Sequence, residues 1–151
     1  MAERSYTGAE LEPQFDRSKL GKVLAEADVE ITDEAALRYA RTVGETNPRF
    51  SRPGPGLEVM PGMLIILDRP MDRVPVTFPF GKLAFPGGNT LEAYDLVRPG
   101  DILHIAVRLT EVYVKTGRAG PMGFVVHEKE YVRRRDGKLV ARSKDTYLTR
   151  P

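Results

Sequence analysis

Acid–base chemistry could be carried by a short segment that follows a predicted helix. Residues 44–50 read Gly-Glu-Thr-Asn-Pro-Arg-Phe and hold one carboxylate, Glu45, and one side-chain amide, Asn47. The two histidines of the chain, His104 and His127, lie inside predicted strands, where we expect structural or surface roles. A histidine could work with Glu45 only if the fold brought the two together. The alternative is that Glu45 is a helix-terminal acid that binds solvent or nearby backbone.

An amphipathic helix is predicted directly before this segment. Thr32 can cap the first turn, and the helix is expected to run from Asp33 to about Val43. Gly44 is suited to the left-handed conformation that ends many helices. The pair Asn47-Pro48 then favours an extended or turning chain over more helix.

The most hydrophobic run of the chain, residues 60–67, is interpreted as a short helix. Pro61 near its start and Pro70 after its end fit this, because proline is tolerated in a first turn and stops a later one. The run is apolar all round, so such a helix would be buried on most sides. A buried strand is the alternative, since periodicity does not exclude it. Residues 70–86 are expected to connect elements.

Strands dominate the remainder of the predicted domain. Alternating apolar residues from Leu103 to Leu109 are typical of a half-buried antiparallel strand. The run Arg133-Arg134-Arg135 precedes the turn Asp136-Gly137 and is interpreted as a solvated strand end. Helices followed by a meander of strands indicate an α+β domain with the helices on one face of the sheet. The expected strands are residues 23–31, 89–97, 102–114, 122–134 and 139–148.

The composition is that of one soluble globular domain, with 151 residues, 41% hydrophobic and 29% charged. We expect residues 1–20 to form an arm and residues 21–151 the domain. The net charge of +2 gives no reason to expect nucleic acid or an anionic membrane as partner. With no cysteine and two separated histidines, we expect no disulfide and no metal. Neither a signal-peptide core nor a membrane-length apolar stretch is found, so a cytoplasmic protein is expected.

Three signatures, together with the order of elements, resemble the MaoC-like dehydratases and (R)-specific enoyl-CoA hydratases, and most closely the N-terminal, FAS1-like half of that family. The likeness covers nearly the whole chain from about residue 20. It implies a hot-dog fold, in which a sheet wraps a central apolar helix, here Pro61 to about Asp68, and in which domains pair. The signatures are Tyr39-Ala-x-x-Val-Gly-Glu-x-Asn-Pro-x-Phe50, Val97-Arg-Pro-Gly-Asp101, and Lys115-Thr-Gly-Arg-x-Gly120 leading into Phe124-Val-Val126.

The resemblance implies a reaction and its residues. Active members add water to a 2-enoyl thioester or remove it from a (3R)-hydroxyacyl thioester, using the motif Asp-x-Asn-Pro-x-His. On this sequence the aspartate position holds Glu45, Asn47-Pro48 is intact, and the histidine position holds Phe50. Glu45 and Asn47 are therefore the catalytic candidates. Phenylalanine neither accepts nor donates a proton, and Glu45 moves its carboxylate by a methylene, so the motif is broken where catalysis depends on it.

The resemblance also implies residues that would bind an acyl thioester. Gly62 could present a backbone N–H to the thioester oxygen, or it could simply allow close packing. Met63 belongs to an apolar set expected to be core, with contact to an acyl chain as an addition. Lys115 and Arg118 could meet the phosphates of coenzyme A or phosphopantetheine, or be turn charges without a specific role. No cofactor is implied.

Three functions follow from a broken motif on an intact scaffold. The first is an acyl-binding, non-catalytic subunit of a heteromeric (R)-specific enoyl-CoA hydratase or (3R)-hydroxyacyl thioester dehydratase, paired with a hot-dog partner that carries the complete motif. The second is an independent hydratase that uses Glu45 with a histidine from elsewhere. The third is a non-enzymatic acyl-CoA-binding hot-dog domain. The expected partners are an acyl-CoA or acyl-carrier thioester and a second hot-dog subunit.

Overall fold

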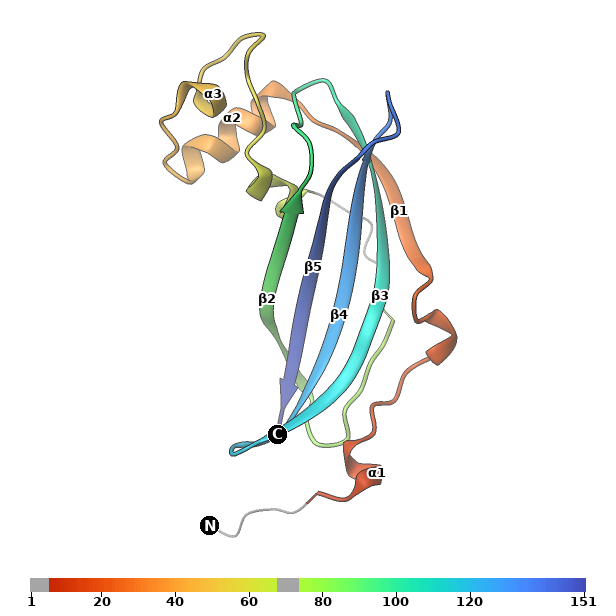
Figure 1. Cartoon of the computed structure of the whole chain (residues 1–151). Coiled ribbons are helices and arrows are strands. Elements are labelled where there is room, and N and C mark those ends of the chain that lie inside the picture. Colours follow the sequence, from red (N-terminus) through yellow and green to blue (C-terminus); the bar gives the residue numbers. More distant parts are fainter. Residues whose placement is uncertain (1–5, 68–73) are drawn as a thin grey trace.

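The chain folds around one five-stranded antiparallel sheet, with helices α2 and α3 gathered at one end of it (Figure 1). The computed structural model describes residues 6–67 and 74–151. The strand order is β1-β3-β4-β5-β2, so β1 and β2 are the edges. This architecture confirms the predicted α+β class. The strands are β1 Val23–Glu30, β2 Leu83–Ala93, β3 Ile102–Gly117, β4 Gly120–Arg133 and β5 Leu139–Arg150.

Strand β2 differs most from its predicted range. It begins at Leu83, within the predicted connection, and ends at Ala93. Pro86 lies inside β2, and the pairing with β5 shifts register between Pro86 and Gly88. Proline is tolerated there because β2 is an edge strand, where one backbone side needs no partner. Residues 70–73 of the predicted connection lie outside the described residues.

The helix before the candidate motif is confirmed together with its signals. Helix α2 spans Asp33–Thr42, and the hydroxyl of Thr32 accepts the N–H of Ala35 at 3.1 Å. Gly44 adopts φ 72°, the left-handed conformation that its position predicted. A further turn of helix, α3 (Pro48–Ser51), forms where an extended or turning chain was expected. Proline in the first position of a helix lacks only an N–H that would have no partner there.

The apolar run forms a 3-10 helix, η2 (Pro61–Ile66), so the helical interpretation is confirmed over the strand. Met63 and Leu64 are buried, whereas Ile66 is 64% exposed, so η2 is covered on one side only. The hydroxyl of Tyr131 in β4 donates to the carbonyl of Leu64 at 2.8 Å and ties η2 to the sheet. Around this bond lies the apolar core: Ile31, Ala36, Leu57, Val59, Met63, Leu64, Leu67, Val97, Leu103, Ile105, Tyr131, Val140 and Ala141.

The buried face of the sheet also carries an ion pair. Nζ of Lys129 in β4 lies 2.6 Å from Oδ2 of Asp145 in β5, and both side chains are almost fully buried. The amide of Asn89 in β2 donates to Oδ1 of the same aspartate at 2.5 Å. Three neighbouring strands are thus joined by side chains as well as by backbone.

The N-terminal segment that the structure describes precedes β1 in the chain. It contains α1 (Gly8–Leu11) and a short 3-10 helix, η1 (Arg17–Lys19). Gln14 pairs with Thr77 in an isolated antiparallel bridge.

Candidate functional site

A cavity of about 350 Å³ lies where α3, η2 and the segment after β2 meet. Its volume is near the lower end of the ~300–1,000 Å³ found for small-molecule sites. Most of the lining side chains are apolar, and Arg49 and Asp95 are the charged ones. The lining residues are Arg49, Phe50, Val59, Pro61, Leu64, Ala93, Tyr94, Asp95, Leu96 and Val97.

Phe50 lines this cavity at the position where the resemblance places a histidine. The guanidinium of Arg49 lies over its ring, with 5.2 Å from Cζ to the ring centroid. Neither histidine of the chain is among the lining residues. The cavity therefore offers an aromatic ring, and no imidazole, beside the broken motif.

Glu45 and Asn47 build the loop that carries Phe50. Oε1 of Glu45 accepts the N–H of Asn47 at 2.7 Å. Oδ1 of Asn47 in turn accepts the N–H of Arg49 at 3.0 Å and caps α3. Neither Glu45 nor Asn47 lines the cavity. In this geometry both side chains are engaged in shaping the backbone.

The histidines lie in other surroundings. Nδ1 of His104 is 2.8 Å from Oδ1 of Asp28, and its Nε2 is 3.3 Å from Oε2 of Glu26, in the neighbouring strand β1. His127 is buried in β4, directly opposite Asp145 of β5. The fold does not pair either histidine with Glu45 by a hydrogen bond or ion pair.

A buried carboxylate joins two arginines next to the cavity. Nε of Arg49 donates to Oε2 of Glu58, and Nη2 of Arg98 lies 3.6 Å from Oε1 of the same group. The side chain of Glu58 is 11% exposed, against 49% for Arg49 and 52% for Arg98. The backbone N–H of Glu58 also donates to the carbonyl of Arg49 at 2.9 Å. No local sequence pattern indicates this trio, because Arg98 lies far along the chain from Arg49 and Glu58.

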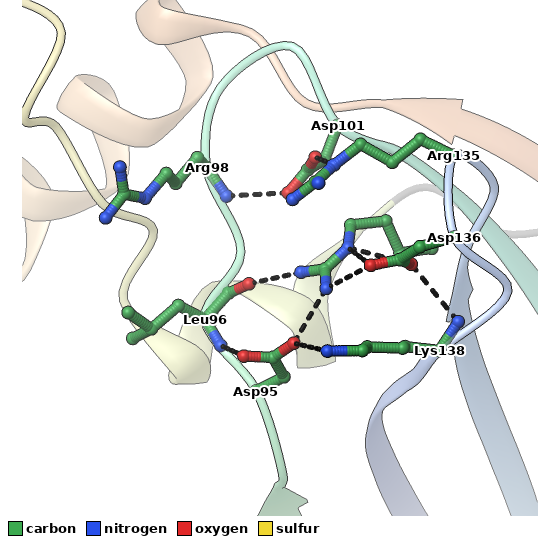
Figure 2. A network of polar contacts seen from close by, with 8 residues as sticks. Asp95, Leu96, Arg98, Asp101, Arg135, Asp136 and Lys138 are labelled. Atoms are coloured by element: carbon green, nitrogen blue, oxygen red, sulfur yellow. Dashed lines mark hydrogen bonds and ion pairs between the residues drawn. The ribbon is translucent and has the colours of Figure 1, made fainter.

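Arg133 binds the segment after β2 that forms one wall of the cavity. Its Nη1 donates to the carbonyl of Leu96 at 2.7 Å, and its Nη2 donates to Oδ2 of Asp95 at 2.7 Å (Figure 2). The same guanidinium binds both carboxylate oxygens of Asp136, which lowers the pKa of that carboxyl to about 2. Its hydrogen bond likewise lowers the pKa of Asp95. Arg133 is 3% exposed, so the interpretation of the arginine run as a wholly solvated strand end is wrong at this residue.

Gly62 and Met63 lie in η2. A Cβ at Gly62 would come within 2.6 Å of the Tyr39 hydroxyl oxygen, so a larger residue here would force the tyrosine side chain to shift. This contact favours the packing role that was the alternative for Gly62. Met63 is 3% exposed and belongs to the core. It also lines a second cavity of about 350 Å³ between β1, α2 and η2.

The turn between β3 and β4 lies at the opposite end of the sheet from α2 and α3 (Figure 1). Lys115 is near the end of β3, with Nζ 5.3 Å from the ring centroid of Tyr113, and Arg118 is in the turn before β4. A single chain therefore does not bring these two cations to the cavity beside Phe50.

Neither a metal site nor a membrane-spanning helix is found in the part of the chain that the structure describes. No group of three or more histidine, cysteine, aspartate or glutamate side chains in residues 6–67 and 74–151 is placed to hold a metal ion. Within the same residues, no helix has the length and apolar character needed to cross a membrane.

Several solved structures are similar to this chain over most of its length. A MaoC-like dehydratase from Rhodospirillum rubrum is 19% identical, with a TM-score of 0.55 over 91% of this chain and 99% of that one. The ChsH1–ChsH2 complex from Mycobacterium tuberculosis is 14% identical, with a TM-score of 0.59 over 92% and 83%. The R-hydratase PhaJ1 from Pseudomonas aeruginosa is 14% identical, with a TM-score of 0.56 over 91% and 87%. At these identities the likeness shows the fold.

Sequence comparison identifies the family. No curated protein matches the chain. The family model described as FAS1-like, dehydratase domain region, matches residues 18–143, which is most of the chain. The match and the shared hot-dog fold agree with the signatures around Phe50, Asp101 and Gly120. The chain therefore belongs to the FAS1-like dehydratase-region family, and its fold is the hot-dog fold.

Proposed function

We propose that this protein is the acyl-binding, non-catalytic subunit of a heteromeric (R)-specific enoyl-CoA hydratase or (3R)-hydroxyacyl thioester dehydratase. The observation that carries the proposal is that Phe50 lines the cavity where a catalytic histidine would be needed. Hydration of an enoyl thioester requires a base for the attacking water and an acid for the neighbouring carbon. A phenyl ring supplies neither.

The state of Glu45 supports the same conclusion. A carboxylate that acts as a base must reach the water that it deprotonates. The carboxylate of Glu45 instead accepts a backbone N–H two residues away and does not line the cavity. What the cavity offers is a small, mainly apolar space for an acyl group.

The free edge of the sheet supports association with a second subunit. Strand β2 is eleven residues long, and among the residues that the structure describes it pairs with β5 on one side and with no strand on the other. Leu83 is 69% exposed and Phe85 is 43% exposed along it. Unpaired apolar edges of this kind are templates for another chain. The similar ChsH1–ChsH2 structure is a complex, and we infer that a hot-dog partner with the complete motif completes the active site here.

The test is reconstitution with such a partner. The chain should co-purify with a hot-dog protein that contains Asp-x-Asn-Pro-x-His, and the mixture should hydrate crotonyl-CoA or a longer enoyl-CoA. The chain alone should bind the acyl thioester without turnover. A stable homodimer that never associates with such a partner would contradict the proposal, and so would turnover by the chain alone.

A further inference from the structure

The guanidinium of Arg49, which lines the cavity, has N–H donors that no acceptor in the described residues uses. Arg49 uses its Nε–H on Glu58 and lies over the ring of Phe50. Within residues 6–67 and 74–151, no acceptor is found for its Nη1 and Nη2 groups, although Arg49 lines the cavity. The side chain is half exposed, so the edge of the guanidinium formed by Nη1 and Nη2 is accessible to a ligand.

The charge next to the cavity is unbalanced. Glu58 is the carboxylate for both Arg49 and Arg98, so one positive charge is left over. The carboxylate that does line the cavity, Asp95, already has Arg133 and Lys138 as cationic partners. The cavity is therefore suited to an anion.

A purely structural role explains Arg49 less well. The segment that carries Arg49 is already joined to Glu58 by the backbone hydrogen bond between them. Helix α3 is capped by Asn47 without help from the guanidinium. A cavity for an unsubstituted acyl chain would be expected to keep charged groups out of its lining.

We propose that the acyl group bound in this cavity carries a second carboxylate, which Arg49 binds through its free Nη edge. This inference rests on the proposed acyl-binding function and names its substrate class as short acyl thioesters with a carboxylate. Guanidinium and carboxylate match in a planar, two-bond geometry, which makes arginine the natural partner for that group.

The experiment compares succinyl-CoA with butyryl-CoA by titration calorimetry on the full chain, with its partner subunit present when binding requires it. The two thioesters share the coenzyme and a four-carbon acyl group and differ in the terminal carboxylate. We expect succinyl-CoA to bind about tenfold more tightly, the size expected of a partly exposed charge-assisted pair. Arg49→Gln should abolish the preference of succinyl-CoA over butyryl-CoA, and circular dichroism and urea unfolding of the variant show whether it is folded. Arg52→Gln, at an exposed arginine outside the cavity lining, is the matched control and should keep the preference.

Each other outcome overturns the inference. Equal affinity of the two thioesters for the unmodified protein excludes a carboxylate site. Equal weakening of both by Arg49→Gln means that Arg49 binds the coenzyme and not the acyl group. Retention of the preference in Arg49→Gln assigns it to another residue. Failure of both thioesters to bind contradicts the proposed function itself, and this inference with it.

Discussion

The carboxylate of Glu45 accepts the backbone N–H of Asn47, with 2.7 Å between Oε1 and N. The carboxylate at the aspartate position of the motif thus helps to fix the loop that places Phe50 in the cavity wall. A carboxylate with this partner is a local structural element, and its removal should affect the loop more than the chemistry of an assembled enzyme.

Replacement of Glu45 tests that assignment. Glu45→Ala should lower the free energy of unfolding by about 0.5–1.5 kcal/mol, the value of one hydrogen bond. Glu45→Gln, whose amide oxygen can still accept the N–H, should be nearly neutral. Urea unfolding measures the first effect. In the reconstituted complex both variants should keep turnover within about twofold of the unmodified protein, because a hundredfold loss is the scale of a missing acid or base.

Arg133 should be the most sensitive residue of the cavity wall. Arg133→Met removes the partner of Asp95, Asp136 and the Leu96 carbonyl together. We expect a loss of about 2–4 kcal/mol in unfolding free energy, as for breaking a buried charged network from one side. The control is Arg135→Met in the same hairpin, whose side chain is 63% exposed and pairs with Asp101. Arg135→Met should lower the free energy of unfolding by about 1 kcal/mol or less. Equal losses for the two variants would contradict the greater contribution of Arg133.

Acid should weaken the same network. The hydrogen bond from Arg133 lowers the pKa of Asp136 from 3.8 to about 2, so the folded state holds the ionised form more strongly than the unfolded chain does. The resulting stability is present above pH 3.8 and is lost as the pH falls through about 2. Unfolding followed from pH 5 to pH 2 should show this decline. Asp136→Asn should flatten the decline over that window, and an unchanged slope would rule Asp136 out as its source.

The buried Lys129–Asp145 pair predicts a strong coupling. Lys129→Met leaves Asp145 with the amide of Asn89 but without its cation, and should destabilise the fold by about 3–5 kcal/mol. The double variant Lys129→Met/Asp145→Leu should lose much less than the sum of the single variants, because no buried charge remains unpaired. Additive single effects in urea unfolding would show that the two groups do not interact.

The free edge of β2 predicts the site of subunit association. Phe85→Lys places a charge on that edge and should dissociate the complex while leaving the fold intact, since Phe85 is 43% exposed. Ile102→Lys, at a residue that is 44% exposed in β3, is the matched control and should keep the complex. Light scattering after size exclusion measures both. Dissociation by Ile102→Lys alone would show that the interface does not lie along β2.

Local signals in the sequence predicted the elements well where one physical cause dominated. Thr32 and Gly44 marked the ends of α2, and the alternation from Leu103 to Leu109 marked β3, because capping and two-residue periodicity act within a few residues. The start of β2 was missed because prolines argue against a strand in general, whereas an edge strand accepts them.

The site depends on contacts that no local pattern contains. The Arg49–Glu58–Arg98 trio and the hydrogen bond from Arg133 to the Leu96 carbonyl join residues that are far apart in the chain. Only the three-dimensional structure shows that Phe50 and Val97 line one cavity. The motif pointed to the loop that carries Phe50, a residue of the cavity lining, and the replacement at its histidine position was visible from the sequence.

In the proposed function, this chain binds an acyl thioester but needs a second subunit for the reaction. The most direct measurement is the hydration of crotonyl-CoA by three samples: the purified chain, a partner that carries Asp-x-Asn-Pro-x-His, and their mixture. Turnover by the mixture should be far above that of either protein alone, and Glu45→Gln in this chain should leave it unchanged. Turnover by this chain alone that disappears in Glu45→Gln would show instead that the chain is itself a hydratase.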